Sequence, residues 1–149
     1  MIDYKFYDTS SLLVLAQNDV LWPEETINMS SISLKEIEGI KNSASKSQDV
    51  KFAARALAHR IDENPKQFNI IIFKESMLTP IINAELPIND DMRILATAIY
   101  FDKNYHPDET IFVSNDISLK CHANLFFGDG IIESIQPLLR QPYSGYKSI

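Results

Sequence analysis

Short apolar runs that suit β-strands alternate along this chain with segments whose apolar residues recur at helical spacing. Strand-like runs are expected at 5–7, 26–32, 68–73, 110–113 and 131–132. Helical segments are expected to begin close to Thr9, Ser33, Asp49, Asn89 and Asp116. This alternation favours an α/β fold, in which a central, mostly parallel sheet is flanked by helices. The run at 68–73 (FNIIIF) is apolar on both faces, so it is expected to be a central strand.

The 149 residues are enough for one domain of ordinary size and too few for two. We expect this domain to span residues 1–137. Residues 138–149 contain Pro142 and Gly145 and lose the periodicity of the preceding segments, so they are expected to form an exit segment or linker.

The charge balance limits the classes of function that the chain can serve. It has 14 Lys and Arg residues against 20 Asp and Glu residues, which gives a formal net charge of -6. This balance excludes a uniformly basic nucleic-acid binder. An acidic protein can still act on phosphates where its carboxylates hold a divalent cation, because the bound ion reverses the local potential.

The cysteine content and the N-terminal residues bear on the compartment. Cys121 is the only cysteine, which rules out an intramolecular disulfide and a four-cysteine zinc site. The first ten residues are acidic where a signal peptide needs basic residues, and no apolar run is long enough to cross a bilayer. We therefore expect a cytoplasmic protein with no membrane partner.

Four acidic residues occupy corresponding places in the expected elements. Asp8 and Asp116 follow apolar strands, Glu36 lies in the first turns of a helix, and Asp91 lies in the first turn of another. In an open parallel sheet such positions meet at the carboxyl edge, where ligands bind. Carboxylates that converge there must either take up protons or hold cations, and oxygen ligands without His or Cys suit Mg²⁺ or Mn²⁺. This pattern predicts phosphoryl chemistry.

The residues around these acids form recognisable motifs. Residues 6–13 read FYDTSSLL, and residues 89–96 read NDDMRILA, with Asp91 rather than Asp90 three residues before Ile-Leu. Further motif-like stretches are found at 32–41 (ISLKEIEGIK), 52–56 (FAARA), 112–120 (FVSNDISLK) and 143–146 (YSGY). Together these stretches resemble the PIN-domain ribonucleases, and among them the PIN domains joined to PhoH-like ATPases.

The chain departs from the family pattern at three positions. Ser10 stands where the family usually has Asn, Asp90 where the PhoH type has Asn, and Ser118 where some members carry a further acid. The third departure implies a site of four acids rather than five. No Walker phosphate-loop pattern occurs, so the ATPase half of a PhoH-like protein is not in this sequence.

The resemblance implies a three-layer PIN-like domain that acts as a divalent-metal-dependent endoribonuclease on single-stranded RNA. The catalytic and metal-binding acids would be Asp8, Glu36, Asp91 and Asp116, holding Mg²⁺ or Mn²⁺. The residues implied in orienting ligands or binding the RNA backbone are Thr9, Lys51, Arg55, Arg60, Arg93 and Ser114. Besides RNA, the partners that it implies are a PhoH-like ATPase domain, an antitoxin of the kind that accompanies VapC toxins, and a second copy in a homodimer.

Other interpretations stay open. The chain could be a catalytically weak PIN domain that acts as an RNA- or protein-binding module of a PhoH-like protein. A phosphatase of the haloacid dehalogenase type would need a second acid where Ser10 stands, and a receiver domain would need an early acidic pair. Taken singly, Asp8, Asp91 and Asp116 also suit helix N-termini, and Lys51, Arg55 and Arg60 suit a solvated helix face.

Overall fold

The computed structural model describes residues 4–105, 107–128 and 132–137. Its centre is one sheet of five short strands in the order β3-β2-β1-β4-β5. The strands are β1 (Tyr4–Tyr7), β2 (Ile27–Ser30), β3 (Phe68–Ile71), β4 (Thr110–Val113) and β5 (Ile132–Glu133). All four neighbouring pairs are parallel, so the carboxyl ends of the strands share one edge.

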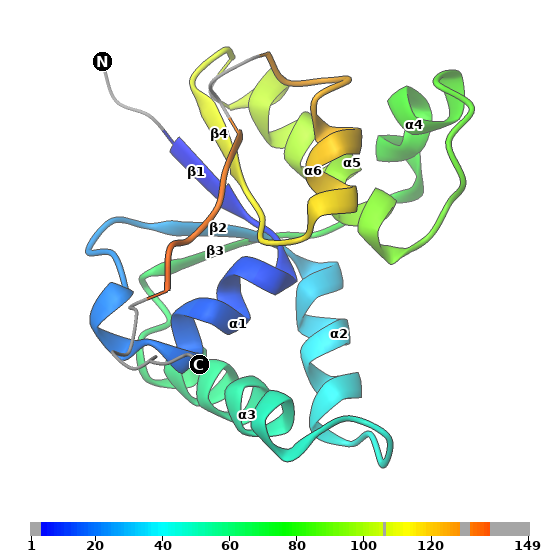
Figure 1. The fold of residues 1–149 in the computed structure, drawn as a ribbon. Helices are drawn as coiled ribbons and strands as arrows, with labels where there is room; N and C mark the ends of the chain where they lie inside the picture. The colour runs from blue at the N-terminus through cyan, green and yellow to red at the C-terminus, as the bar shows by residue number, and fades with distance from the viewer. Residues whose placement is uncertain (1–3, 106, 129–131, 138–149) are drawn as a thin grey trace, which may run out of the picture.

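Helices cover both faces of this sheet, as Figure 1 shows. One side carries α1 (Thr9–Gln17), α2 (Ser31–Lys41) and α3 (Gln48–Glu63), and the other carries α4 (Thr79–Asn83), α5 (Asp90–Asn104) and α6 (Ile117–Ala123). Two short 3₁₀ helices, η1 (Asp19–Leu21) and η2 (Glu75–Leu78), join these layers. The expected three-layer α/β fold is thus confirmed. None of the described helices is both long and apolar enough to span a bilayer.

Each helical layer closes its own apolar core against the sheet. Leu12 and Leu57 are fully buried in the core beneath α1, α2 and α3. On the opposite face Leu95 and Phe101 of α5 are buried together with residues of η2, α4 and α6. Both cores rest on the same strands, because adjacent strand residues point to opposite faces.

The run at 68–73 is not a central strand, and this expectation was wrong. β3 ends at Ile71 and lies at the edge of the sheet, next to β2. Asn69 is exposed there, and Ile72 is 62% exposed. A run of apolar residues cannot show whether a second strand pairs on its far side, so its position in the sheet depends on the rest of the chain.

Several boundaries also differ from the sequence-based expectations. β2 stops at Ser30, whose hydroxyl accepts the Ile32 N–H at 3.1 Å and so begins α2 two residues before Ser33. The spacing of Phe52, Ala53, Ala56, Leu57 and Ile61 predicts that these residues form the buried stripe of α3, but Phe52 is 65% exposed and Ala54 is buried instead. The helix α4 and both 3₁₀ helices were not predicted. Residue 131 and the segment 138–149 lie outside the described residues.

Candidate active site

The strand register brings the predicted acidic motifs to the same edge of the sheet. Tyr7, the last residue of β1, pairs with Met29 of β2 and with Val113 of β4. The residues that follow β1 and β4 are Asp8 and Ser114. They therefore lie side by side at the carboxyl edge, where open parallel sheets bind their ligands.

Asp8 is a buried carboxylate held by hydroxyl and amide donors. It is 2% exposed, and Ser114 Oγ donates a hydrogen bond of 2.6 Å to its Oδ2. Ser10 Oγ lies 2.9 Å from both carboxylate oxygens, and the Ser11 N–H donates to Oδ1 at 2.9 Å. Burial raises the pKa of Asp8, and these hydrogen bonds act in the opposite direction. The carboxylate is thus fixed in orientation although its charge is poorly solvated.

Ser10, which stands where the family usually has Asn, connects two segments of the site. Besides contacting Asp8, its hydroxyl accepts the backbone N–H of Asn115 at 2.9 Å. One side chain thus connects the start of α1 to the loop after β4. The sequence around Ser10 gave no signal for this contact, because its partner is 105 residues away.

Glu36 is oriented by a residue from another helix. Thr9 Oγ1 donates to Glu36 Oε1 at 2.6 Å and is hydrogen-bonded to the Ser33 hydroxyl at 2.8 Å. Burial raises the pKa of Glu36, the Thr9 hydrogen bond opposes this, and the charges of Asp91, Asp90 and Asp8 raise it further. Glu36 therefore lies within the field of the other acids.

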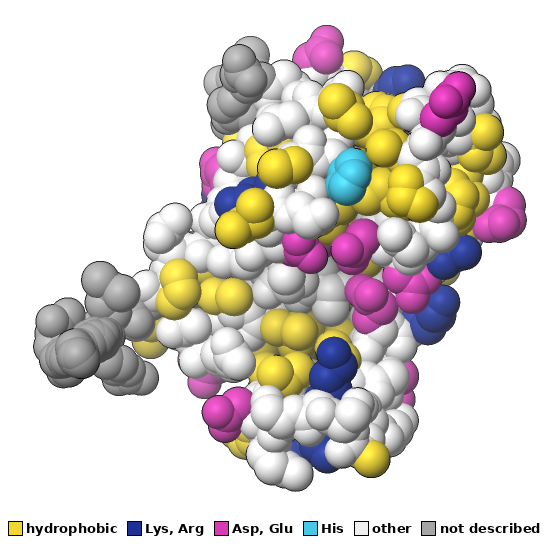
Figure 2. Space-filling model, turned by 45° about the vertical axis from the view of Figure 1, so that its right-hand side comes forward, with side chains coloured by type: hydrophobic (Ala, Val, Ile, Leu, Met, Phe, Trp, Pro, Cys, Tyr) yellow, Lys and Arg dark blue, Asp and Glu magenta, His cyan; other side chains and the backbone are white. Residues whose placement is uncertain are grey.

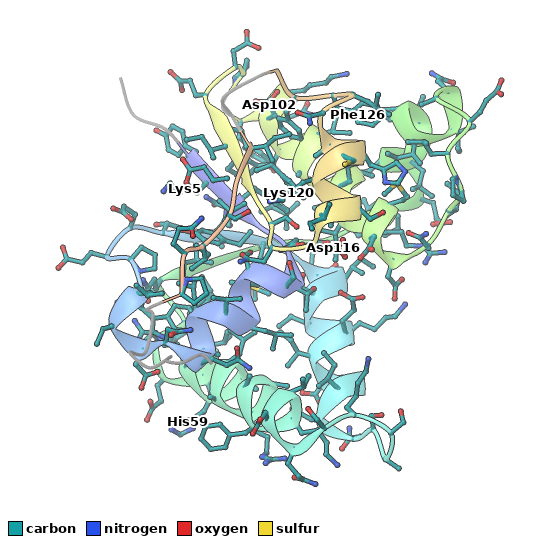
Figure 3. The ribbon with its side chains drawn as sticks, viewed as in Figure 1. Lys5, His59, Asp102, Asp116, Lys120 and Phe126 are labelled. Carbon is teal, nitrogen blue, oxygen red and sulfur yellow. The ribbon has the colours of Figure 1, made fainter. Side chains whose placement is uncertain are left out.

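Asp91 and Asp116 complete the group. Burial raises the pKa of Asp91, followed by the charges of Asp116, Asp8 and Asp90, while His122 acts to lower it. Asp116 lies in the turn between β4 and α6 (Figure 3) and caps α6 by accepting the Leu119 N–H at 3.1 Å. The four predicted acids are thus electrostatically coupled at one edge. In Figure 2 acidic side chains form a band where the two helical layers meet.

The side chains at this edge are of the type that binds hard divalent cations. All four side chains offer carboxylate oxygens, and burial, followed by the charges of neighbouring acids, raises the pKa of Glu36 and Asp91. Among the residues that the structure describes, no three His, Cys, Asp or Glu side chains already surround a common point as a ligand set. The role of Asp8, Glu36, Asp91 and Asp116 in binding metal therefore stays a prediction.

Arg93 lies at the rim of the acidic edge in a small ion-pair network. Its Nη1 is 2.8 Å from Asp90 Oδ1, and Lys35 Nζ is 3.2 Å from the same oxygen. Burial acts to raise the pKa of Asp90, but the hydrogen bonds and charges of these two cations prevail, so its pKa lies below the usual value. Asp90 is consequently a counterion, unlike its neighbour Asp91.

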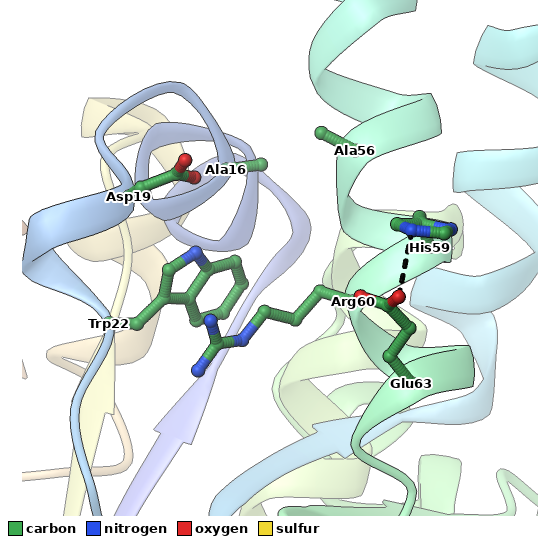
Figure 4. A pocket seen from close by; sticks show the side chains of 7 residues that line it. All are labelled: Ala16, Asp19, Trp22, Ala56, His59, Arg60 and Glu63. Carbon is green, nitrogen blue, oxygen red and sulfur yellow. Dashed lines mark ion pairs between the residues drawn. The ribbon is translucent and has the colours of Figure 1, made fainter.

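Arg60 of α3 is not brought to the acids. Its guanidinium lies 4.6 Å from the ring centroid of Trp22, and its Nη2 donates to Gln67 Oε1 at 3.2 Å. These side chains border an open pocket of about 300 Å³ that also contains Ala16 and Asp19 (Figure 4). This pocket is at the C-terminal end of α1, roughly 13 Å along the helix from its start at Asp8.

Lys51 and Arg55 stand on the same helix as Arg60. Lys51 is half-buried and Arg55 is exposed. α3 packs against α1 and α2, in the layer that lies beneath the acidic edge in Figure 1. Their predicted contact with RNA stays a prediction.

Comparison with known proteins decides the family. A sequence profile of the PIN domain matches residues 7–126. The chain belongs to the PIN domain family. PIN domains are generally nucleases that depend on divalent metal ions. The match is to the family as a whole and does not address the PhoH-type subgroup.

A solved structure shares the fold of this PIN domain. The crystal structure of PAE2754 from Pyrobaculum aerophilum aligns with a TM-score of 0.57 over 88% of this chain and 83% of that chain, at 16% identity. The crystal structure of VapBC2 from Rickettsia felis, bound to a DNA fragment from their promoter, aligns with a TM-score of 0.48 at 23% identity. That alignment covers 87% of this chain and 98% of the other. No curated protein sequence gives a significant match.

Proposed function

We propose that this PIN domain is an endoribonuclease that hydrolyses phosphodiester bonds of single-stranded RNA with the help of Mg²⁺ or Mn²⁺. The observation that carries the proposal is the coupling of four acids at the carboxyl edge, with Asp8 buried among donors that hold its carboxylate in place. Uncompensated charges are costly in such a position, so the site favours occupation by a cation. Family membership supports the nuclease class.

The proposed ligands are the four acids at this edge, Asp8, Glu36, Asp91 and Asp116. A bound divalent ion supplies a water of lowered pKa and offsets the charge that develops on the phosphate. Hydrogen bonds from Ser114 and Ser10 hold the Asp8 carboxylate, and the Thr9 hydroxyl holds Glu36. No serine, cysteine or histidine nucleophile is needed.

The phosphate backbone needs cationic contacts beside these acids. Among the predicted cations, Arg93 is supported by its contact with Asp90, the chain neighbour of Asp91. A guanidinium suits this task because its N–H groups match two oxygens of a phosphate. We propose Arg93 as a backbone contact ahead of Arg60, which is engaged with Trp22 and Gln67.

We also propose the domain bounds and the partners that the sequence indicates. They are a PIN domain that spans residues 1–137, an exit segment at 138–149, and a PhoH-like ATPase domain, an antitoxin or a second copy as partner. A non-catalytic PIN domain that binds RNA or protein is the second candidate. The absence of a preassembled ligand set among the described side chains favours it.

Cleavage of labelled RNA tests the proposal. Purified protein is incubated with single-stranded RNA of mixed sequence in Mn²⁺, in Mg²⁺ and in excess EDTA, and the fragment ends are mapped. We expect internal cuts with metal and none in EDTA. Asp8→Asn and Asp116→Asn should abolish the cuts, whereas Asp62→Asn, an exposed acid of α3, should leave them unchanged.

Two results would contradict the nuclease proposal. One is cleavage at the same rate in EDTA or by the Asp8→Asn variant, which would point to another site or a contaminant. The other is saturable RNA binding without any cleavage in either metal, which would select the second candidate.

A further inference from the structure

Two cationic side chains converge on a single oxygen atom beside the acidic edge. Lys35 Nζ and Arg93 Nη1 lie 3.2 and 2.8 Å from Asp90 Oδ1. Lys35 comes from α2 and Arg93 from α5, so the contact joins the two helical layers. Two cations thus share one carboxylate, in a protein whose formal net charge is -6.

The position of this contact relates it to the proposed reaction. Lys35 is the chain neighbour of Glu36, and Asp90 is the chain neighbour of Asp91. The charge of Asp90 acts on both Glu36 and Asp91, so the carboxylate that the two cations contact lies beside the acids. Figure 2 shows Lys and Arg side chains at one end of the acidic band.

The opposite side of the band has a different character. On α6, beyond Asp116, Ile117 is 75% exposed, and Leu125 just after that helix is 63% exposed. α6 also carries Lys120 and His122, but Lys35 and Arg93 are the cations that meet at a single carboxylate oxygen. Such an asymmetry would orient an RNA strand across the site.

We propose that Lys35 and Arg93 form a second phosphate-binding site for the RNA strand, and that Asp90 occupies this site in the free protein until a backbone phosphate displaces it. This inference rests on the proposed nuclease function. The point now filled by Asp90 Oδ1 is a position for a phosphate oxygen, because both cations already reach it. Arg93 and Lys35 can make charge-assisted hydrogen bonds to phosphate in place of those to carboxylate. Asp90 thus acts as a built-in competitor that weakens binding of RNA.

Binding of RNA in EDTA, where the proposed hydrolysis cannot proceed, separates this inference from the cleavage assay. The probe is a fluorescently labelled single-stranded RNA of mixed sequence, and the readout is anisotropy over a range of salt concentrations. Asp90→Asn should tighten binding by about fivefold, which is the scale of a partly exposed ion pair. Lys35→Ala and Arg93→Ala should weaken binding, and each should lower the slope of log K against log salt by about one.

Matched variants on α2 distinguish this site from a general effect of charge. Glu38→Gln and Lys41→Ala disrupt a similar ion pair, in which Lys41 Nζ lies 3.0 Å from Glu38 Oε2. We expect both to leave the affinity within about twofold of the wild type. In a Lys35→Ala/Arg93→Ala background, Asp90→Asn should no longer tighten binding, because the site that it frees is gone.

The inference is overturned if Asp90→Asn changes the affinity no more than Glu38→Gln does. It is also overturned if the gain persists after both cations are removed, since the effect would then be general repulsion. Either result alongside normal Mn²⁺-dependent cleavage would leave the proposed function intact. If the variants change RNA binding as predicted but the protein does not cleave RNA, only the nuclease proposal is contradicted.

Discussion

Asp8, Glu36 and Asp91 are charged residues in places where charge is unfavourable unless something compensates it. Burial raises the pKa of each of them in the folded protein, and the charges of neighbouring carboxylates raise the pKa of Glu36 and Asp91 further. The folded state therefore binds more protons than the unfolded state at pH values between the ordinary and the raised pKa. By linkage, the free energy of unfolding must decrease as the pH rises through this window.

This linkage gives a prediction for the protein in EDTA. Urea unfolding should show a larger free energy of unfolding at pH 5 than at pH 7, and Asp91→Asn should reduce the difference between the two. Asp62→Asn, which alters an exposed acid, should keep the wild-type difference. Asp90 contributes to the pH dependence in the opposite direction. Its pKa is lowered in the folded protein, so it adds to the free energy of unfolding, and this contribution is lost as the pH falls. An Asp91→Asn variant with unchanged pH dependence would show that its charge is not coupled to the others.

Ser10 is predicted to act on the reaction through Asp8. Ser10→Ala removes the hydroxyl that contacts both Asp8 oxygens and accepts the Asn115 N–H. We expect RNA cleavage to fall by about tenfold to a hundredfold, with a higher Mn²⁺ concentration needed for half-maximal rate. Ser10→Thr keeps the hydroxyl and should recover much of the rate. Equal rates and Mn²⁺ requirements for Ser10→Ala and the wild type would rule out this role.

Sequence motifs predicted which acids meet, but not what supports them. Asp8 and Asp116 could be chosen because each follows a strand, and Asp91 because it begins a helix, and such positions share an edge in any parallel sheet. Glu36 lies further along its helix, at the sixth residue of α2. The contacts of Ser10 with Asn115 and of Lys35 with Asp90 depend on side chains far apart in the chain. No local pattern encodes them.

Helix N-termini are the elements that place the acids. The first residues of α1, α5 and α6 follow N-caps at Asp8, Asn89 and Asp116, whose side chains accept backbone N–H groups. Two of these caps are themselves members of the acidic group. The third, Asn89, fixes the turn that carries Asp91, so the geometry of the site depends on how each helix begins.

Removing the cap of α5 should therefore affect both stability and cleavage. Asn89→Ala loses the bond of 2.9 Å between its side-chain oxygen and the Met92 N–H. We expect a loss of about 1 kcal/mol in the free energy of unfolding and a slower reaction. Ser47→Ala removes the equivalent cap of α3, at 3.3 Å from Val50 N, and serves as the control. Ser47→Ala should lower the free energy of unfolding by a similar amount without slowing cleavage. If both variants slowed cleavage equally, the effect of Asn89 on the reaction would not act through the position of Asp91.

The elements themselves were predictable to different degrees. β4 was expected at 110–113 and is found there, because a β-branched apolar run is followed at once by a polar capping sequence. α4 was missed because its five residues lie between other irregular segments and give no full helical period. The edge position of β3 was missed because it is a property of the whole sheet.

The whole molecule has two apolar cores that share one thin sheet. Because the strands are four residues long or shorter, neither helical layer has a sheet of its own to rest on. Loss of one layer would expose the apolar side chains of the strands beneath it. The domain is therefore expected to unfold as one cooperative unit.

The single tryptophan gives a local probe for this expectation. Trp22 packs against Phe68 in the layer of α1, α2 and α3, whereas Leu95 is buried in the opposite layer. Leu95→Ala should lower the free energy of unfolding by about 2–5 kcal/mol. Trp22 fluorescence and far-ultraviolet circular dichroism should report the same shifted urea midpoint. A fluorescence midpoint that does not move would show that the two layers unfold independently.

At this scale the sequence predicted the fold class and the meeting point of the acids. Both follow from the alternation of strands and helices, which forces parallel strands with a common carboxyl edge. Family motifs then selected Asp91 over its neighbour Asp90 as a metal ligand, which stays a prediction. In the structure Asp90 has two cationic partners, whereas burial and then neighbouring charges raise the pKa of Asp91. The separation of Arg60 from the acids could not be foreseen without knowing which way its side chain points along α3.

Titration of the purified protein with Mn²⁺ by calorimetry tests the central claim most directly. We expect saturable Mn²⁺ binding at neutral pH. The binding should be weaker in each of the variants Asp8→Asn, Glu36→Gln, Asp91→Asn and Asp116→Asn, and unchanged in Asp62→Asn. Binding that is absent, or that is the same in the wild type and all four site variants, would contradict it.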